Sequence, residues 1–256
     1  AGIDFSLLNY KLEGSVNYYN RKQSDLLGTY SVPVPPNVIA NSYVNVGTMK
    51  NTGIEIELRY NAVRTKDFDY TLSFIGSTSD NKFVSFSNRL YEGQKFYWMD
   101  GFPTYPGNPG PVQRIEEGQR VGNFYTFRYA GVDDNGNWLV YDKSGEKIPV
   151  SQGTDADKCV VGNGMPEFTA SLTNNFRYRN LDLTLYFRGA FGYQIYDAQD
   201  LYYGVMGAAP GTNVLKSAYS ENAHITEGKN VHSSYFVHDG DFVKLDVATL
   251  GYTWKI

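Results

Sequence analysis

The chain has 256 residues, a formal net charge of -4, a pI near 5.4 and 41% hydrophobic residues. The absence of a basic excess argues against a nucleic-acid partner. No run approaches 18 consecutive apolar residues, which excludes a transmembrane helix.

Aromatic residues are abundant, with 22 Tyr, 15 Phe and 3 Trp. Aromatic girdles at two bilayer interfaces need such a supply, because a transmembrane barrel carries one at each end. A β-sandwich or a sugar-binding module is also rich in tyrosine, so composition leaves both classes open. The lone cysteine, Cys159, excludes an intrachain disulfide. We expect any export signal to lie outside this segment or to have been removed already.

The first third of the chain alternates apolar and polar residues, the pattern of strands with one dry and one wet face. Residues 3–7 and 12–18 are predicted strands joined by a polar turn at 9–11, and a loop containing prolines is predicted at 28–47. In "NTGIEIELRY" (51–60), one face carries Ile54, Ile56, Leu58 and Tyr60. The other face carries Glu55, Glu57 and Arg59.

The rest of the chain repeats this pattern between turns of unequal length. A short turn at 64–67 leads to a strand whose alternation breaks at Ile75, and 80–120 is predicted to be irregular. Residues 123–132 form a strand that leads to a hairpin turning at Asn135-Gly136. Strands at 168–178 and 181–191 follow, joined by a turn at 179–180, although Asn174 falls on an apolar face. A loop at about 192–233 precedes a last extended stretch, 242–256.

Short turns therefore alternate with long connections. This asymmetry is typical of an up-and-down barrel in an outer membrane, with tight periplasmic turns and long external loops. A soluble sandwich gives more even spacing.

Four stretches, in order, carry a family resemblance: "VNVGTMKNTGIEIEL" (44–58), "EEGQRVGNFYTFRYAGVDDNGN" (116–137), "GNGMPEFTASLTNNFRYRNLDLTLYFRGAFGYQIYD" (162–197) and "SSYFVHDGDFVKLDVATLGYTW" (233–254). They resemble segments of the SusC/RagA-like TonB-dependent outer-membrane transporters. Each match is modest, and the ordered set is specific.

The resemblance implies an all-β fold: an antiparallel transmembrane β-barrel segment, about 7–9 strands of a larger barrel of about 22, with long extracellular loops. Residues 1–256 would form one partial barrel domain without a plug domain or either barrel end. The remaining wall would come from residues outside this segment, since bare strand edges are not viable in lipid.

The resemblance also implies a function. The whole protein would be a multi-pass importer of oligosaccharides or peptides in the outer membrane of a Gram-negative bacterium. Its partners would be a SusD-like surface lipoprotein, the ligand, the membrane lipid and the TonB system, the last reached through the missing N-terminal part. No cofactor, metal or nucleic acid is expected.

Wall residues are assigned to faces by alternation. We expect a lumen-facing set of Glu55, Glu57, Arg59 and Arg188, and a lipid-facing set of Ile54, Ile56, Leu58, Leu183, Leu185 and Phe187. Tyr252 and Trp254 share a face suited to the periplasmic girdle.

Loop aromatics are the candidate ligand contacts. The candidates are Phe96, Tyr97, Trp98, Tyr105, Tyr202 and Tyr203, with Phe102 in the same loop as the first four. Sugar and peptide groups both pack on such rings. The alternative is that these side chains fold their own loops or contact a partner protein.

Other candidate chemistry is weaker. Glu55 and Glu57 suggest a glycosidase pair only if they converge in a cleft, and strand alternation favours a wet wall instead. "DDNGN" (133–137) lacks the spacing of an EF-hand and favours a tight turn. His224, His232 and His238 lack metal-ligand spacing and are expected to be surface histidines, and no nucleophile elbow occurs. We therefore expect no enzyme. A soluble carbohydrate-binding β-sandwich and a secreted β-rich glycosidase remain the alternatives.

Overall fold

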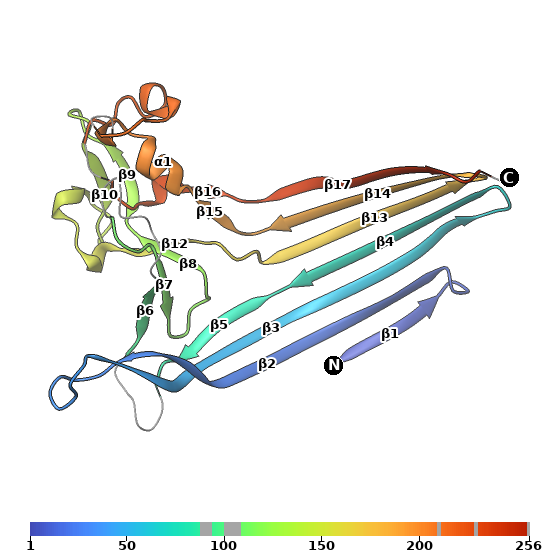
Figure 1. The fold of residues 1–256 in the computed structure, drawn as a ribbon, viewed down its shortest axis with the longest axis horizontal. Helices are drawn as coiled ribbons and strands as arrows, with labels where there is room; N and C mark the ends of the chain where they lie inside the picture. The colour runs from blue at the N-terminus through green and yellow to red at the C-terminus, as the bar shows by residue number, and fades with distance from the viewer. Residues whose placement is uncertain (88–93, 100–108, 209–210, 228–229, 255–256) are drawn as a thin grey trace.

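The chain folds into one long antiparallel sheet with a smaller folded region at one end (Figure 1). A computed structural model describes residues 1–87, 94–99, 109–208, 211–227 and 230–254. We call the long sheet the wall. The head is the region made by the two long connections at 86–167 and 192–241.

The wall is an eight-stranded sheet in the order β1-β2-β3-β4-β13-β14-β17, in which β5 also pairs with β3. Its strands are β1 (Gly2–Leu7), β2 (Leu12–Ser31), β3 (Asn41–Arg64), β4 (Phe68–Thr78), β5 (Asp80–Ser85), β13 (Phe168–Tyr178), β14 (Leu181–Phe191) and β17 (Phe242–Tyr252). Four of them, β4, β13, β14 and β17, are 11 residues long. That length matches a tilted strand crossing a bilayer, about 9–11 residues.

Strand register aligns the alternating patterns of neighbouring strands into two continuous faces. Leu58 pairs with Phe74, Phe74 with Leu172, and Leu172 with Phe187. The next row joins Arg59, Ser73, Thr173 and Tyr186 in the same way. One face of the wall is therefore largely apolar and the other largely polar, as the alternation predicts.

The predicted turn asymmetry is confirmed. The β1–β2, β3–β4 and β13–β14 turns are short and lie at one end, near the C-terminus in Figure 1. Leu8, Asn9, Tyr10 and Arg179 have positive φ there. Both long connections leave the wall at the opposite end.

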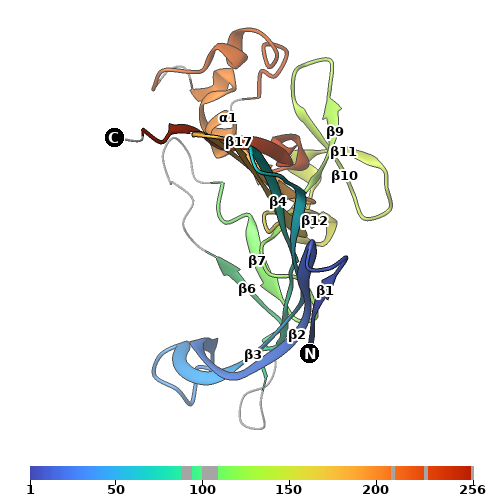
Figure 2. The ribbon, with the colours of Figure 1, turned by 90° about the vertical axis from the view of Figure 1, so that its right-hand side faces the viewer.

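The predicted loop at 28–47 is wrong over most of its length, because β2 continues to Ser31 and β3 begins at Asn41. Tyr30 and Val46 are buried against Phe83 and Phe86, and this packing carries the hairpin beyond the rest of the wall. Prolines confine the break in pairing to the tip, since they lack a backbone donor. Figure 2 shows this hairpin curling away from the wall.

The predicted irregular segment 80–120 also contains strands, and the loop at 192–233 contains helical turns. The head strands are β6 (Phe96–Met99), β7 (Gln113–Glu116), β8 (Asn123–Thr126), β9 (Arg128–Val132), β10 (Trp138–Tyr141), β11 (Lys147–Pro149), β12 (Cys159–Asn163), β15 (Gln194–Tyr196) and β16 (Val237–Asp239). Its helix is α1 (Ala198–Tyr203), and its 3-10 turns are η1 (Val150–Gln152), η2 (Asp155–Asp157), η3 (Met206–Ala208), η4 (Lys216–Tyr219) and η5 (Ser234–Phe236). Among the described residues, no helix is both long enough and apolar enough to cross a membrane.

Both long connections contribute to one head core. Trp138 from the first packs with Leu201, Ile225 and Phe236 from the second. Hydrogen bonds cross the same boundary: the Thr126 hydroxyl donates to the His232 carbonyl at 2.7 Å, and the Trp138 amide donates to Glu227 Oε2 at 2.9 Å. The two connections are therefore one folded unit.

Candidate functional site

The predicted lumen-facing residues occupy the polar face of the wall together. Glu55, Glu57 and Arg59 follow one another at every second position of β3 and are exposed. Arg188, on β14, makes an ion pair with Asp246 of β17 (Nε to Oδ2, 2.6 Å). Within the described ranges, neither Glu55 nor Glu57 forms an ion pair with another residue. That this face encloses a lumen stays a prediction.

The predicted lipid-facing residues share the opposite face. Val16 pairs with Ile56, and Phe176 pairs with Leu183, so the set runs across neighbouring strands. The side chain of Ile54 is 44% exposed and that of Leu250 is 73% exposed. Figure 1 shows no second layer over β4, β13, β14 and β17 in the part of the chain that the structure describes. The described part of the chain therefore leaves this apolar face uncovered by a second sheet, and contact of this face with lipid stays a prediction.

One polar residue on the apolar face has a local partner. Asn174, which breaks the alternation of β13, accepts a hydrogen bond from the Tyr70 hydroxyl at 2.8 Å. The Tyr70 ring stacks on Phe176, with 4.5 Å between centroids. Tyr70 lies on the neighbouring strand β4 and Phe176 on β13 itself. The Asn174 side chain is therefore satisfied by residues of its own strand and of the next one.

Tyr252 and Trp254 lie at the short-turn end, where their rings meet edge to face at 5.8 Å. Tyr252 pairs with Leu181 and so shares the apolar face. Both residues are exposed. The position fits the predicted girdle, which remains untested.

The first aromatic cluster surrounds a cation that sequence reasoning missed. Arg114 of β7 lies 4.7 Å from the Phe96 ring centroid, 5.6 Å from that of Trp98 and 3.3 Å from that of Tyr125. Its side chain is 12% exposed and pairs with Glu116 at 2.5 Å. Trp98 and Arg114 are cross-strand partners; the residues of "QRIE" (113–116) and "FYWM" (96–99) could have suggested two short strands, but not that these strands pair.

The two faces of β6 therefore have different surroundings. Phe96 and Trp98 are held by Arg114 through cation–π contacts. Tyr97, between them in sequence, lines a mostly apolar recess of about 280 Å³ beside the β2–β3 hairpin. Phe96 and Tyr97 are about two-fifths exposed and therefore remain proposals as ligand contacts.

The remaining candidate aromatics are placed differently. Tyr202 is 2% exposed in the head core, and burial raises the pKa of its hydroxyl. Its ring therefore packs inside the head core in this structure. Tyr203 packs at the edge of the same core. Phe102 and Tyr105 lie outside the described residues.

"DDNGN" is a tight turn. Asp133 Oδ1 accepts hydrogen bonds from the amides of Asn135 (2.9 Å) and Asn137 (2.8 Å). Together with the bond from the Asn137 side chain, these lower the pKa of the Asp133 carboxyl. Gly136 adopts φ +80°, and Val132 pairs with Trp138. The hairpin predicted at Asn135-Gly136 is confirmed.

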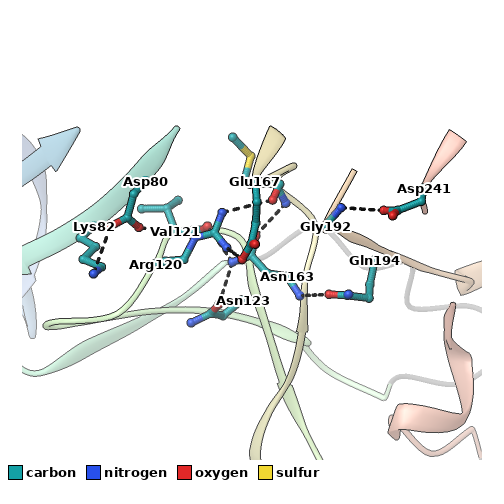
Figure 3. A network of polar contacts seen from close by, with 11 residues as sticks. Asp80, Lys82, Arg120, Val121, Asn123, Asn163, Glu167, Gly192, Gln194 and Asp241 are labelled. Atoms are coloured by element: carbon teal, nitrogen blue, oxygen red, sulfur yellow. Dashed lines mark hydrogen bonds and ion pairs between the residues drawn. The ribbon is translucent and has the colours of Figure 1, made fainter. Parts of the chain in front are cut away.

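A belt of polar contacts joins the wall to the head (Figure 3). Arg120 reaches Glu167 (Nη1 to Oε1, 2.8 Å) and Asp80 (Nε to Oδ1, 3.6 Å), which flank the point where β5 and β13 separate. Backbone bonds from Phe83 to Gln119 (3.1 Å) and from Val121 to Asn81 (2.9 Å) place the segment around Arg120 beside β5. The segment around Arg120 thus lies beside β5 in the way that β13 lies beside β4.

The belt continues through buried amides. Asn163 donates from Nδ2 to Asn123 Oδ1 at 2.7 Å and to the Val121 carbonyl at 3.1 Å. The backbone N–H of Asn163 donates to Gln194 Oε1 at 2.8 Å, and this bond ties the first connection to the second. These bonds hold the two connections of the head together.

Sequence comparisons relate the chain to known receptors. It is 29% identical over 273 residues to TonB-dependent receptor P3 of Formosa agariphila, covering 98% of this chain and 26% of the relative. It is 26% identical over 265 residues to TonB-dependent receptor SusC of Bacteroides thetaiotaomicron, covering 100% of this chain and 25% of SusC. The chain therefore spans about a quarter of the length of these curated relatives. No protein-family model matches it.

Comparison with solved structures gives the same fold. The RagAB peptide importer in its closed-closed state matches with a TM-score of 0.76 and 20% identity, over 98% of this chain and 28% of that one. The RagAB peptide transporter matches with a TM-score of 0.73 and 19% identity, over the same shares. Sequence and fold together confirm the predicted resemblance: over nearly its whole length, this chain matches a barrel segment of the SusC-like TonB-dependent receptors.

Proposed function

We propose that the chain is a partial barrel domain, residues 1–256, of a TonB-dependent outer-membrane importer. The observation that carries this proposal is the single-layer wall, whose apolar face is uncovered and whose polar face gathers Glu55, Glu57, Arg59 and Arg188. A wall of this kind separates hydrocarbon from an aqueous lumen. The head lies at the long-connection end, which corresponds to the external side of such barrels.

The cargo and partners of the whole protein are part of the proposal. The RagAB peptide importer, which matches in fold, supports a peptide cargo, and the family resemblance of the sequence makes oligosaccharides the other proposed cargo. We propose that a SusD-like lipoprotein closes over the head and that the TonB system acts through parts of the protein outside this segment. Exposed rings on β6, Phe96 and Tyr97, are the proposed ligand contacts. This mechanism needs no covalent chemistry from the chain.

The alternatives predict different surroundings for the wall. A soluble carbohydrate-binding sandwich needs a second sheet over the apolar face of β3 and β14, and Figure 1 shows none among the described residues. A glycosidase needs two carboxylates converging in a cleft, whereas Glu55 and Glu57 are both exposed on one strand. Neither alternative is favoured by a specific contact.

A matched pair of substitutions tests the membrane wall. Leu185 lies midway along β14 on the apolar face, whereas Ile75 of β4 is a hydrophobic residue on the polar face. In the full-length protein in bilayers, Leu185→Asp should lower the unfolding free energy by on the order of 2 kcal/mol, because it places a charge in hydrocarbon. Ile75→Asp should cost much less. Urea titration of each variant measures the difference, and equal losses would refute a lipid-facing apolar side.

Transport is tested in cells. A strain whose only importer of this class is the full-length protein should take up oligosaccharides or peptides, and should lose uptake when the gene is deleted. Affinity purification of the full-length protein should recover a surface lipoprotein. A stable, detergent-free monomer without uptake activity would instead support the soluble module.

A further inference from the structure

A recess on the polar face of the wall is formed by four adjacent strands, β4, β13, β14 and β17. It has a volume of about 230 Å³. The residues that line it and enter the argument are Ile75, Thr169, Ser171, Tyr186, Arg188 and Phe242. It lies outside the aromatic clusters and the polar belt described above.

Register explains why a depression exists at this place. One row joins Ile75, Ser171 and Arg188, and the next row toward the head joins Ser77, Thr169, Ala190 and Phe242. In the first row the short side chain of Ser171 lies between Ile75 and Arg188, and in the second row only Phe242 is large. Gly189 and Ala190 are buried and form part of the floor. The recess therefore has hydroxyl groups at its centre and Ile75, Tyr186 and Phe242 at its edges.

The positive charge at one rim is only partly neutralised. Asp246 Oδ2 lies 2.6 Å from Arg188 Nε, and Asp246 Oδ1 lies 3.1 Å from Lys244 Nζ. Two cations thus share one carboxylate. The Arg188 side chain is 50% exposed and lies 5.5 Å from the Phe242 ring centroid. Across the described ranges, the two Nη groups of Arg188 donate no hydrogen bond to another residue.

We propose that this recess binds a carboxylate group of the imported cargo, an inference that rests on the proposed function. The carboxylate accepts hydrogen bonds from the Arg188 Nη groups. The hydroxyls of Ser171, Thr169 and Tyr186 contact the polar groups of the cargo that adjoin this carboxylate. Arginine suits this role because its planar fork matches a carboxylate. Phe242 and Ile75 provide apolar contact for the rest of the ligand. The same chemistry serves a uronic acid and a peptide C-terminus.

Binding to the full-length purified protein tests the recess with paired probes. The acidic and neutral sugars are hexagalacturonate and maltohexaose; the peptides are one pentapeptide with a free C-terminus and its C-terminal amide. Wild type should prefer the free carboxylate in at least one pair. Arg188→Gln should weaken binding of that acidic probe about tenfold, the value of one charge-assisted hydrogen bond, and leave its neutral counterpart unchanged.

Two further variants separate a direct contact from a change in the fold. Arg177 also lies on the polar face of the wall, 60% exposed and paired with Asp69, but near the short turns. Arg177→Gln should leave the preference for the carboxylate unchanged. Ser171→Leu fills the centre of the recess without altering its charge and should weaken binding of the acidic probe.

The outcomes distinguish this proposal from the proposed function. If cells take up cargo but wild type shows no carboxylate preference, or if Arg188→Gln and Arg177→Gln behave alike, the recess proposal alone is overturned. Equal loss of acidic and neutral probes in Arg188→Gln also overturns it, because it marks a structural role. The absence of any uptake by wild type defeats the proposed function itself. The pair in which the preference appears identifies the source of the carboxylate.

Discussion

At the scale of single residues, partners decide what a side chain does. His232 was expected to be a surface histidine, and this is wrong: it is buried between the two connections of the head. Its Nε2–H donates to the Gly110 carbonyl at 2.8 Å, and its Nδ1 accepts from the Tyr196 hydroxyl at 2.7 Å. Burial lowers the pKa of the imidazole from 6.5 to about 4.

This shift predicts acid sensitivity of the head. The unfolded segment takes up a proton near pH 6.5 and the folded one only near pH 4, so stability is complete above pH 6.5 and falls as the pH falls toward 4. At pH 5 the head should be less stable by about 2 kcal/mol than at pH 7. Hydrogen exchange of residues 123–132 in the full-length protein measures this loss.

Matched variants assign the effect to this histidine. His232→Gln should abolish the pH dependence, whereas His238→Gln, at an exposed position, should retain it. If His232→Gln retains the dependence, another group is responsible.

At the scale of elements, two tight turns of the head each contain a glycine in a left-handed conformation. Gly136 has φ +80° and Gly145 has φ +91°. A Cβ added at Gly136 would lie 2.2 Å from Thr226 Oγ1 and 2.8 Å from the Thr226 amide nitrogen, whereas one added at Gly145 meets nothing within 4 Å. The two positions therefore separate backbone strain from steric conflict.

Gly145→Ala should lower the stability of the head by about 1 kcal/mol, the cost of the left-handed conformation alone. Gly136→Ala should cost more, roughly 2 kcal/mol or above, because the β9–β10 turn must also move away from Thr226. Limited proteolysis of the head in the full-length protein ranks the two variants. Equal sensitivity would show that the contact with Thr226 contributes nothing.

At the scale of the whole molecule, the head is one cooperative unit built from distant parts of the chain. Trp138 is 1% exposed and packs on Phe236, with 5.8 Å between ring centroids. Trp138→Ala should destabilise the head by about 3–5 kcal/mol. Faster exchange should appear in α1 and in residues 216–227, which belong to the other connection.

Tyr219→Ala serves as the control, since that ring is 66% exposed. It should leave exchange in both connections unchanged. If Trp138→Ala speeds hydrogen exchange only in β9, β10 and β11, the two connections fold independently.

The sequence by itself determined the wall. Alternation at Ile54, Ile56 and Leu58 fixes which side chains share a face, since the side-chain period of a strand is two residues. Short turns at 9–11, 64–67 and 179–180 mark one end of the sheet, and the ordered family resemblance indicates the class of barrel. These features are local, and they follow from a few neighbouring residues.

Only the tertiary structure decided what happens between the strands and in the long connections. Arg114 meets Phe96 and Trp98, and Tyr202 joins Trp138, across separations that no local period records. The same holds for the recess, where Ile75, Ser171 and Arg188 become neighbours through register. Strand order and long-range packing bring such residues together, and a single sequence carries no direct signal for either.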